Sequence, residues 1–240
     1  MTSYRKILLL VMLLMACAPL VSAADQLTGF PFQNETLHYR VKWPGGGSLG
    51  DVTLTAHKTG ESGWSFEMSA TVGIPVVPIS DTYKSTAAGA DLCSSTLRRE
   101  ISHGAKSVVE ETEFDQQYSR ARRRTLVPAG GGSSEFDIPD CARDALAFQY
   151  FARREMGQGR VPPAGKVFFG SIYEVKMVYT GAIDVPVAGK PVVTDHVNVS
   201  VKGPASDFTF EIFYARDAAR TPLLVKIPVT AGTVSLELVR

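Results

Sequence analysis

The chain has 240 residues, of which 45% are hydrophobic and 20% charged, a composition typical of a globular protein rather than of a disordered or fibrous one. The 25 basic residues nearly balance the 24 acidic ones, so the net charge of +1 provides no overall field that would draw the chain onto nucleic acid or an anionic membrane. Only one apolar run approaches membrane-spanning length, which excludes a polytopic membrane protein.

That apolar run lies at the N-terminus and has the order of a secretory signal peptide. Arg5 and Lys6 precede the unbroken apolar stretch 7–15, and small residues follow as far as Ala24, before the polar Asp25. The run is shorter than the roughly 20 residues that a spanning helix needs. We expect a cleaved signal over residues 1–23, a single β-rich periplasmic domain over 24–240, and no transmembrane segment after cleavage.

The segment 14–17, Leu-Met-Ala-Cys, offers a second way for the chain to be processed. It resembles a bacterial lipoprotein box, in which Cys17 would carry the lipid. Methionine is an unusual residue two positions before such a cysteine, and an ordinary cleavage site follows near Ala23. Cleavage near Ala23 and release into the periplasm are therefore favoured, and a lipid anchor on Cys17 is the alternative.

Removal of the signal leaves Cys93 and Cys141. In an oxidising compartment such a pair is typical of a disulfide, whereas two buried thiols or reactive thiols are the other interpretations. The bridge would close a loop of about 48 residues, for which chain entropy gives about 4 kcal/mol as an upper figure.

From Glu35 onward hydrophobic residues alternate with polar ones, and turn residues recur at short intervals, which predicts an antiparallel meander. The segment 73–78 carries two prolines and is expected to interrupt pairing, and 130–134 is expected to be a loop. We predict a mainly β fold, a curved, barrel-like or half-barrel sheet with one helix. The expected strands cover 37–43, 52–56, 64–70, 80–87, 92–103, 106–115, 118–127, 167–180, 182–187, 192–202, 208–215, 223–228 and 233–239.

The expected helix covers residues 141–156, where Ala145, Phe148, Ala152 and Met156 recur at helical spacing. Asp140 precedes this run as a candidate N-cap, and glycines at 157 and 159 end it.

A run of arginines at 120–124 resembles a polyanion-binding patch, but an acidic strand precedes it. A two-residue turn at 116–117 would make a ladder of ion pairs, and a turn at 104–105 would extend it to the strand before. Each cross-strand pair contributes about 0.2–1 kcal/mol. A structural ladder is therefore favoured over nucleic-acid binding. The predicted pairs are Asp115 with Tyr118, Glu113 with Arg120, Glu111 with Arg122, Glu110 with Arg123, Arg99 with Glu110 and Arg98 with Glu111.

In that register Arg99, Glu110 and Arg123 share a face with hydrophobic residues. Charged groups on the apolar face of a curved sheet cost several kcal/mol unless they are paired or hydrated. We hypothesise that this face lines a solvent-accessible concavity with a net positive charge, which would bind the head group of an amphiphile or another small anion.

The chain lacks the motifs of common catalytic sites, with no nucleophile elbow, zinc-protease motif, phosphate-binding loop or dinucleotide fingerprint. The four histidines are scattered, and His103 and His196 are interpreted as turn and strand residues. Several aspartates lie where turns and caps are expected. We assign no catalytic, cofactor-binding or metal-binding residue and expect no cofactor.

Six segments follow one another along the chain in this order: 37–43, 50–52, 81–85, 144–153, 214–217 and 221–225. This order of elements resembles a family of exported bacterial proteins catalogued as domain of unknown function 3108. The resemblance implies an antiparallel, barrel-like sheet with an accompanying helix and a periplasmic or envelope location, and it brings no activity. The late turn departs from the family pattern, because Tyr214 stands where tryptophan is frequent.

These observations favour a non-enzymatic envelope protein that binds a lipid-like or small amphiphilic ligand in its curved sheet. The alternative is a structural or interaction module that contacts another envelope protein through a sheet edge or the helix. A hydrolase with an unrecognised carboxylate pair is a third interpretation.

Overall fold

The computed structural model describes residues 27–74, 77–187, 189–204 and 207–239, and the structural statements below refer to them. The expected signal peptide and Cys17 lie outside these residues. The described chain forms one 15-stranded sheet and one α-helix, α2 (Ala145–Gly157). The strands are β1 (Glu35–Lys42), β2 (Ser48–Thr59), β3 (Gly63–Ile74), β4 (Val77–Ala88), β5 (Cys93–His103), β6 (Lys106–Asp115), β7 (Arg120–Val127), β8 (Ser133–Asp137), β9 (Arg143–Asp144), β10 (Gly165–Phe168), β11 (Ile172–Val187), β12 (Lys190–Lys202), β13 (Asp207–Ala215), β14 (Pro222–Val229) and β15 (Gly232–Leu238).

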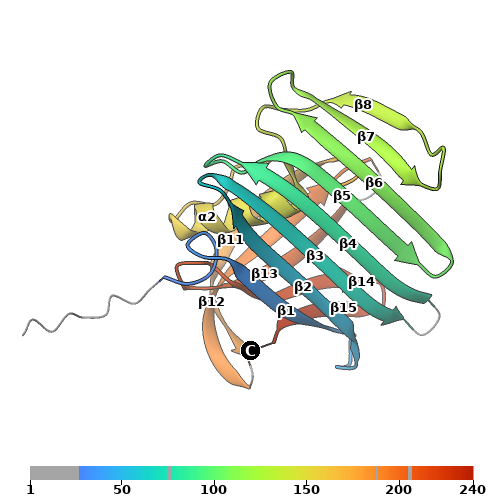
Figure 1. Ribbon diagram of the computed structural model, residues 1–240. Helices are drawn as coiled ribbons and strands as arrows, with labels where there is room; N and C mark the ends of the chain where they lie inside the picture. Colours follow the sequence, from blue (N-terminus) through green and yellow to red (C-terminus); the bar gives the residue numbers. More distant parts are fainter. Residues whose placement is uncertain (1–26, 75–76, 188, 205–206, 240) are drawn as a thin grey trace, which may run out of the picture.

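The strand order is β8-β7-β6-β5-β4-β3-β2-β1-β15-β14-β13-β12-β11-β10-β9, and every pair is antiparallel except β9 with β10. Figure 1 shows the strongly curved sheet with α2 on its concave side. The predicted fold class, a mainly β, curved antiparallel sheet with one helix, is confirmed, and the sheet is open, with β8 and β9 at its edges.

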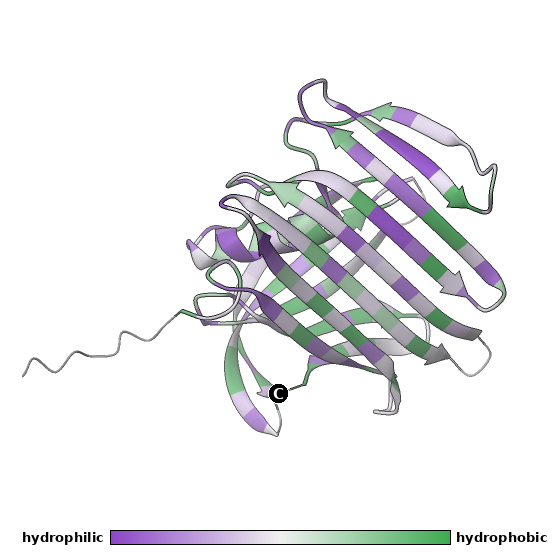
Figure 2. Ribbon diagram, viewed as in Figure 1, coloured by the Kyte–Doolittle hydropathy of each residue, from purple (hydrophilic) through white to green (hydrophobic). Residues whose placement is uncertain are grey.

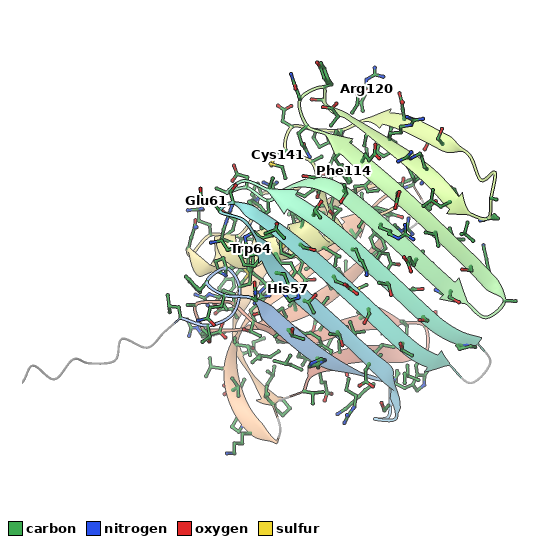
Figure 3. All side chains as sticks on the ribbon, viewed as in Figure 1. His57, Glu61, Trp64, Phe114, Arg120 and Cys141 are labelled. Atoms are coloured by element: carbon green, nitrogen blue, oxygen red, sulfur yellow. A yellow bond between two sulfur atoms is a disulfide. The ribbon has the colours of Figure 1, made fainter. Side chains whose placement is uncertain are left out.

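The sheet curls until β9 lies beside β5. The Ser94 amide donates to the carbonyl of Ala142 at 2.9 Å, and Cys93 and Cys141 form a disulfide at the same place. Strands β6 to β8 continue past this seam, and Phe114 packs edge-to-face on Phe168, with ring centroids 5.4 Å apart. Figure 3 labels Phe114 and Cys141 near the seam. The predicted disulfide is therefore present, and it holds two distant parts of the curled sheet together.

Alternation of buried and exposed residues explains why the strands curl around a core. In β1 the side chains of Glu35, Leu37, Tyr39 and Val41 are buried, and the residues between them face outward. Figure 2 shows the same alternation of hydrophobic and hydrophilic bands along the strands. The helix packs at one end of the enclosed space, against β3, β4, β9 and β10.

The two ends of the sheet differ. We call the end that holds α2 the helix end, and the other end the mouth. At the mouth lie the connections 43–47, 104–105, 128–132, 169–171 and 230–231. The candidate functional site lies at the mouth.

The helix begins four residues later than predicted, at Ala145 instead of Cys141, and Asp140 is not its N-cap. Cys141 has a φ of 50°, and Arg143 and Asp144 pair with β10 as β9. The N-cap is Asp144, whose side chain accepts hydrogen bonds from the amides of Leu146 and Ala147.

The predicted register between β6 and β7 is wrong by two residues. The connection has four residues rather than two, because the Asp115 carboxylate accepts hydrogen bonds from the amides of Gln117 and Tyr118, each at 3.1 Å, and Ser119 adopts a φ of 51°. The observed pairs are Asp115 with Arg120, Glu113 with Arg122, Glu111 with Arg124 and Glu110 with Thr125, so Arg123 lies opposite Thr112. By contrast, the predicted pairing of Arg99 with Glu110 and of Arg98 with Glu111 is confirmed.

Three loop predictions also differ from the structure. The loop expected over 130–134 ends at residue 132, because Ser133 and Ser134 already belong to β8. Pairing of β3 with β4 reaches Gly73 opposite Pro78 and does not stop before the prolines. Two expected strands, 167–180 and 182–187, are instead β10 and one long strand, β11, with a register shift between Tyr179 and Gly181.

Candidate functional site

A cavity of about 420 Å³ lies at the mouth, between the β5–β6 hairpin and the connection from β10 to β11. Its size falls within the range usual for small-molecule sites, roughly 300–1,000 Å³. The lining combines charged and apolar side chains: Arg99, Ile101, His103, Lys106, Val108, Glu110, Arg123, Phe169, Gly170, Ser171 and Tyr173.

Arg99, Glu110 and Arg123, the residues of the predicted ligand face, meet in this lining. Arg99 Nη1 donates to Glu110 Oε2 at 3.0 Å, and Arg123 Nε lies 4.0 Å from Glu110 Oε1. One carboxylate thus faces two guanidinium groups. The side chains of Arg99 and Glu110 are each 15% exposed, and that of Arg123 is 33% exposed. Water and a ligand therefore have access to the cluster.

Arg123 reaches this face despite the shifted register of its strand. Because side chains alternate sides with a period of two, a slip of two residues changes the partners of β7 but not the direction of its side chains. Arg123 lies opposite Thr112 and on the same face as Glu110. The predicted pair was wrong, but the shared face was placed correctly.

Phe169 and Gly170 hold the Arg99 guanidinium in place. Its central carbon lies 5.2 Å from the ring centroid of Phe169 and 5.9 Å from that of Tyr83. A Cβ on Gly170 would lie 1.9 Å from Arg99 Nη1, and the carbonyl of Gly170 accepts a hydrogen bond from Arg123 Nη1 at 2.6 Å. A glycine is therefore required where the two arginines converge.

Arg99 retains an unused donor, because its buried Nε has no hydrogen-bond partner among the described residues. Buried donors of this kind usually have a partner. With Lys106 also in the lining, the cationic groups of the cavity outnumber the single carboxylate of Glu110. The arrangement therefore favours an anionic group.

Apolar side chains continue from the cavity along the concave face. Ile101 lines the cavity and is only partly buried, as are Met68, Ala70 and Val72 farther along the same face. They pack against the buried core without being covered completely. The charged cluster thus borders an apolar surface, which is the chemistry of an amphiphile site.

A second arginine–glutamate pair lies at the helix end, where it is fully enclosed. Arg153 of α2 donates to both carboxylate oxygens of Glu35, at 2.6 and 2.8 Å, and the two side chains are 0% and 6% exposed. Arg153 Nε also donates to the carbonyls of Ala219 and Arg220. Burial opposes the charge of Arg153, but the hydrogen bonds and charge of Glu35 outweigh it and raise the pKa of the guanidinium. The pair fastens the helix to β1.

Asp144 is the other fully buried charged group at the helix end. Its Oδ2 accepts hydrogen bonds from the hydroxyls of Ser85 at 2.5 Å and Ser94 at 2.6 Å, while its Oδ1 caps α2. Burial raises the pKa of this carboxyl, although the hydrogen bonds oppose the shift. All of these contacts join β4, β5 and the helix, so the role of Asp144 is structural.

A second cavity, of about 700 Å³, lies beside the β6–β7 connection and the edge strand β8. Phe114, Tyr118 and Glu135 are among its lining residues, and Tyr118 is 71% exposed. This region lies outside the curled part of the sheet and contains no converging buried charges among the residues described.

The histidines do not gather into a catalytic group. His103 Nε2 lies 3.1 Å from the carboxylate of Asp81 at the mouth. His196 stacks on Phe213 with ring centroids 4.5 Å apart and lies on β12, far along the sheet from His103. Within the described ranges, no group of three or more His, Cys, Asp or Glu residues is arranged to hold a metal ion. No α-helix in that part of the chain is long and apolar enough to cross a membrane.

Sequence reasoning missed one wall of the cavity and both buried clusters of the helix end. Residues 169–171, Phe-Gly-Ser, have the composition of an ordinary turn, and this composition does not indicate which residues the turn contacts. Arg153 could have been found, because Leu146, Tyr150 and Arg153 share one helical face with spacings of four and three, which places the arginine among buried residues.

Comparisons with known proteins support the fold. The family model described as a protein of unknown function, domain of unknown function 3108, matches residues 38–239. No curated protein matches. Among solved structures, a β-barrel-like protein of domain of unknown function 1849 from Brucella abortus is similar, with a TM-score of 0.59 and 10% sequence identity. The alignment covers 85% of this chain and 95% of that one, and at this identity the likeness shows the fold alone.

Proposed function

Since the chain belongs to the family of domain of unknown function 3108, from which no activity carries over, we propose a function from its geometry. The protein binds a lipid-like or other small amphiphilic molecule in the cavity at its mouth, without catalysis. The anionic head group pairs with Arg99 and Arg123, and the apolar part lies along the concave face.

The observation that carries this proposal is the meeting of Arg99 and Arg123 around Glu110 in a cavity with Ile101 and Phe169 in its walls. Two guanidinium groups share one carboxylate, so the cluster keeps a positive charge for an anion. A purely structural pair needs neither a cavity beside it nor an apolar surface behind it.

We also propose that the protein is exported to the periplasm, with the lipid anchor on Cys17 as the alternative. The N-terminal basic residues, apolar run and small residues support export. The Cys93–Cys141 disulfide supports it independently, because such bonds persist in oxidising compartments.

Binding is tested by titration with a fluorescent fatty acid below its micelle concentration, followed by displacement with unlabelled amphiphiles. The variant Arg99→Met/Arg123→Met keeps an unbranched, flexible side chain at each position and removes both charges. Loss of both charge-assisted contacts is expected to weaken binding by at least about 100-fold, since each is worth about 1.5–3 kcal/mol.

The chain provides a matched control on the opposite face of the same strands. Arg98 and Arg124 face outward and pair with Glu111 at 2.6 Å and Glu113 at 2.7 Å, respectively. Arg98→Met/Arg124→Met makes the same change in charge and is expected to bind as the wild type does. Equal binding by both double variants would overturn the role of the arginine pair.

The alternative, an interaction module for an envelope protein, draws support from the free edge of β8. That edge strand has only five residues and carries Glu135 and Asp137, features that discourage pairing with another strand. The cavity proposal is therefore preferred. Two results together would favour the alternative. The wild type would capture a partner from the envelope but bind no amphiphile, and the β8 variant Glu135→Pro would lose that partner.

A further inference from the structure

The β5–β6 hairpin presents three rows of side chains to the cavity. In each row one residue of β5 lies opposite one residue of β6, and all six residues belong to the cavity lining. Neighbouring rows are two residues apart, so the first and the third are separated by four residues of strand, or about 13 Å. The rows are Arg99 with Glu110 (the inner row), Ile101 with Val108 (the middle row) and His103 with Lys106 (the outer row).

Lys106, in the outer row, is a cation of the cavity that the amphiphile's head group does not use. It is exposed, and it forms no ion pair with any of the residues that the structure describes. The carboxylate of the lining, Glu110, pairs instead with Arg99 and Arg123 in and beside the inner row. The cavity therefore has two separate cationic places, one at each end of the three rows.

Asp81 of β4 is the other carboxylate near the outer row, and it is occupied by β5. It lies opposite Ile101, and its side chain is 16% exposed. Its Oδ2 lies 3.1 Å from His103 Nε2, and its Oδ1 accepts a hydrogen bond from the amide of Ser102 at 3.3 Å. Asp81 thus faces His103 and leaves the charge of Lys106 available.

The middle row separates the two cationic places by an apolar surface. Ile101 and Val108 are both only partly buried, so a hydrocarbon chain can cover them. A chain that starts at the inner row and follows this surface ends beside the ammonium group of Lys106. An apolar end is poorly matched to that place, because it removes water from a charge without replacing it, whereas a second anionic group pairs with the ammonium.

We propose that the cavity binds a linear ligand that is anionic at both ends and apolar between them. One anionic group occupies the head-group site at Arg99 and Arg123, and the other pairs with Lys106. The apolar segment lies over the middle row. This inference rests on the proposed function, because it keeps the same head-group site, and it narrows the class of ligand.

The separation of the rows predicts a preferred ligand length. With a C–C bond of about 1.5 Å, an extended chain advances about 1.3 Å per carbon, so a dicarboxylate of about eight to ten carbons places its carboxylates about 9–11 Å apart. The flexible side chains of Arg99 and Lys106 cover the rest of the roughly 13 Å between the inner and outer rows by leaning toward the middle row. Shorter ligands reach only one cationic place.

Isothermal titration calorimetry measures this preference on the protein in the form that the cell produces. The probes are the straight-chain dicarboxylates from adipate to dodecanedioate, each compared with the monocarboxylate of the same length. We expect the monocarboxylates to bind more tightly with every added carbon. The dicarboxylates should instead show a maximum at about eight to ten carbons, where each binds about tenfold more tightly than its monocarboxylate because of the second charge-assisted contact.

Substitutions of Lys106 test which residue recognises the second anionic group. Lys106→Gln should remove the maximum, and Lys106→Arg, which keeps the charge, should retain it. Lys84 of β4 provides the matched control, because it is exposed on the outward face and lies 3.6 Å from Glu67. Lys84→Gln makes the same change in charge and should retain the maximum. A maximum that persists in Lys106→Gln, or dicarboxylates without an advantage at any length in the wild type, would overturn the proposal.

Failure of this proposal and failure of the proposed function give different results. If long monocarboxylates bind, and Arg99→Met/Arg123→Met loses them, while dicarboxylates have no advantage, amphiphile binding stands and the second anionic place is wrong. If neither series binds, both proposals are wrong.

Discussion

The helix end and the mouth each contain an arginine–glutamate pair inside the curled sheet, and the two pairs have different surroundings. Arg153 and Glu35 are enclosed between α2 and β1, and both carboxylate oxygens and all three guanidinium nitrogens take part in hydrogen bonds. Arg99 and Glu110 border a cavity, and Arg99 keeps an unused Nε among the described residues. The same chemistry therefore fastens the fold at one end and is partly exposed at the other, where we propose that it binds a ligand.

The largest effect on stability is expected from breaking the enclosed pair. Glu35→Leu leaves the Arg153 charge buried without a partner, which should lower the free energy of unfolding by about 3–5 kcal/mol. Glu110→Leu leaves arginines that water can reach, so its cost should be about 1 kcal/mol or less. Urea unfolding followed by circular dichroism measures both, and equal costs would show that the two ends do not differ as described.

A second variant tests whether the loss of stability in Glu35→Leu comes from the unpaired charge of Arg153 or from altered packing. Glu35→Leu/Arg153→Met removes both charges and should recover part of the loss in Glu35→Leu, since no buried charge then lacks a partner. A double variant as unstable as the sum of the single variants would contradict this explanation.

The disulfide at the seam should have the next largest effect. Cys93→Ser/Cys141→Ser frees a loop of sequence separation 48 and should cost about 3 kcal/mol, most of the chain-entropy value. Hydrogen exchange should increase first at the Ser94 amide, which pairs across the seam. Unchanged protection of that amide would show that the seam does not depend on the bond.

Asp144 should give the stability of the helix end a dependence on pH. Burial raises the pKa of Asp144 in the folded chain, so the folded state keeps a proton that the unfolded state loses. Its contribution to stability is fully present below the ordinary pKa of aspartate and is lost as the pH rises through the raised pKa. In Asp144→Asn this fall should be absent. Urea unfolding across acidic to neutral pH measures it, and identical profiles for variant and wild type would contradict the assignment.

The smallest change in stability should accompany a clear loss of binding. Gly170 has a φ of +72°, and an added Cβ would displace the Arg99 guanidinium. Gly170→Ala should cost about 1 kcal/mol in stability and weaken amphiphile binding by about tenfold. Gly130 has a φ of +79° with open space around it, so Gly130→Ala shares the strain and should bind normally. Equal binding by the two variants would contradict the positioning of Arg99 by Gly170.

Local patterns in the sequence predicted the parts of the fold that depend on neighbours along the chain. The hairpin at Gly104 gave the correct pairing of Arg99 with Glu110, because a tight turn fixes the register of the strands beside it. The predicted length of the β6–β7 connection was wrong, because the Asp115 carboxylate accepts hydrogen bonds from two amides and the connection is longer. Arg123 was still placed on the correct face, since a slip of two residues preserves the side of each residue.

Such local patterns could not predict contacts between segments that are distant in the chain. Glu35 and Arg153 are 118 residues apart in the chain, and nothing local to β1 indicates that its first buried residue meets a helix. Likewise, the wall formed by Phe169 and Gly170 depends on how far the sheet curls. The charged face could therefore be predicted from the sequence, whereas the cavity that borders it depends on how the open sheet curls in space.

Native mass spectrometry of the protein purified from its own cell envelope, without denaturant, tests the central claim most directly. Amphiphile binding at the mouth predicts a discrete adduct of lipid-like mass that is lost on unfolding and is absent from Arg99→Met/Arg123→Met. The same spectrum gives the state of residues 1–26 and of the Cys93–Cys141 bond. A bare chain in repeated preparations, or an adduct that persists in that double variant, would contradict the account.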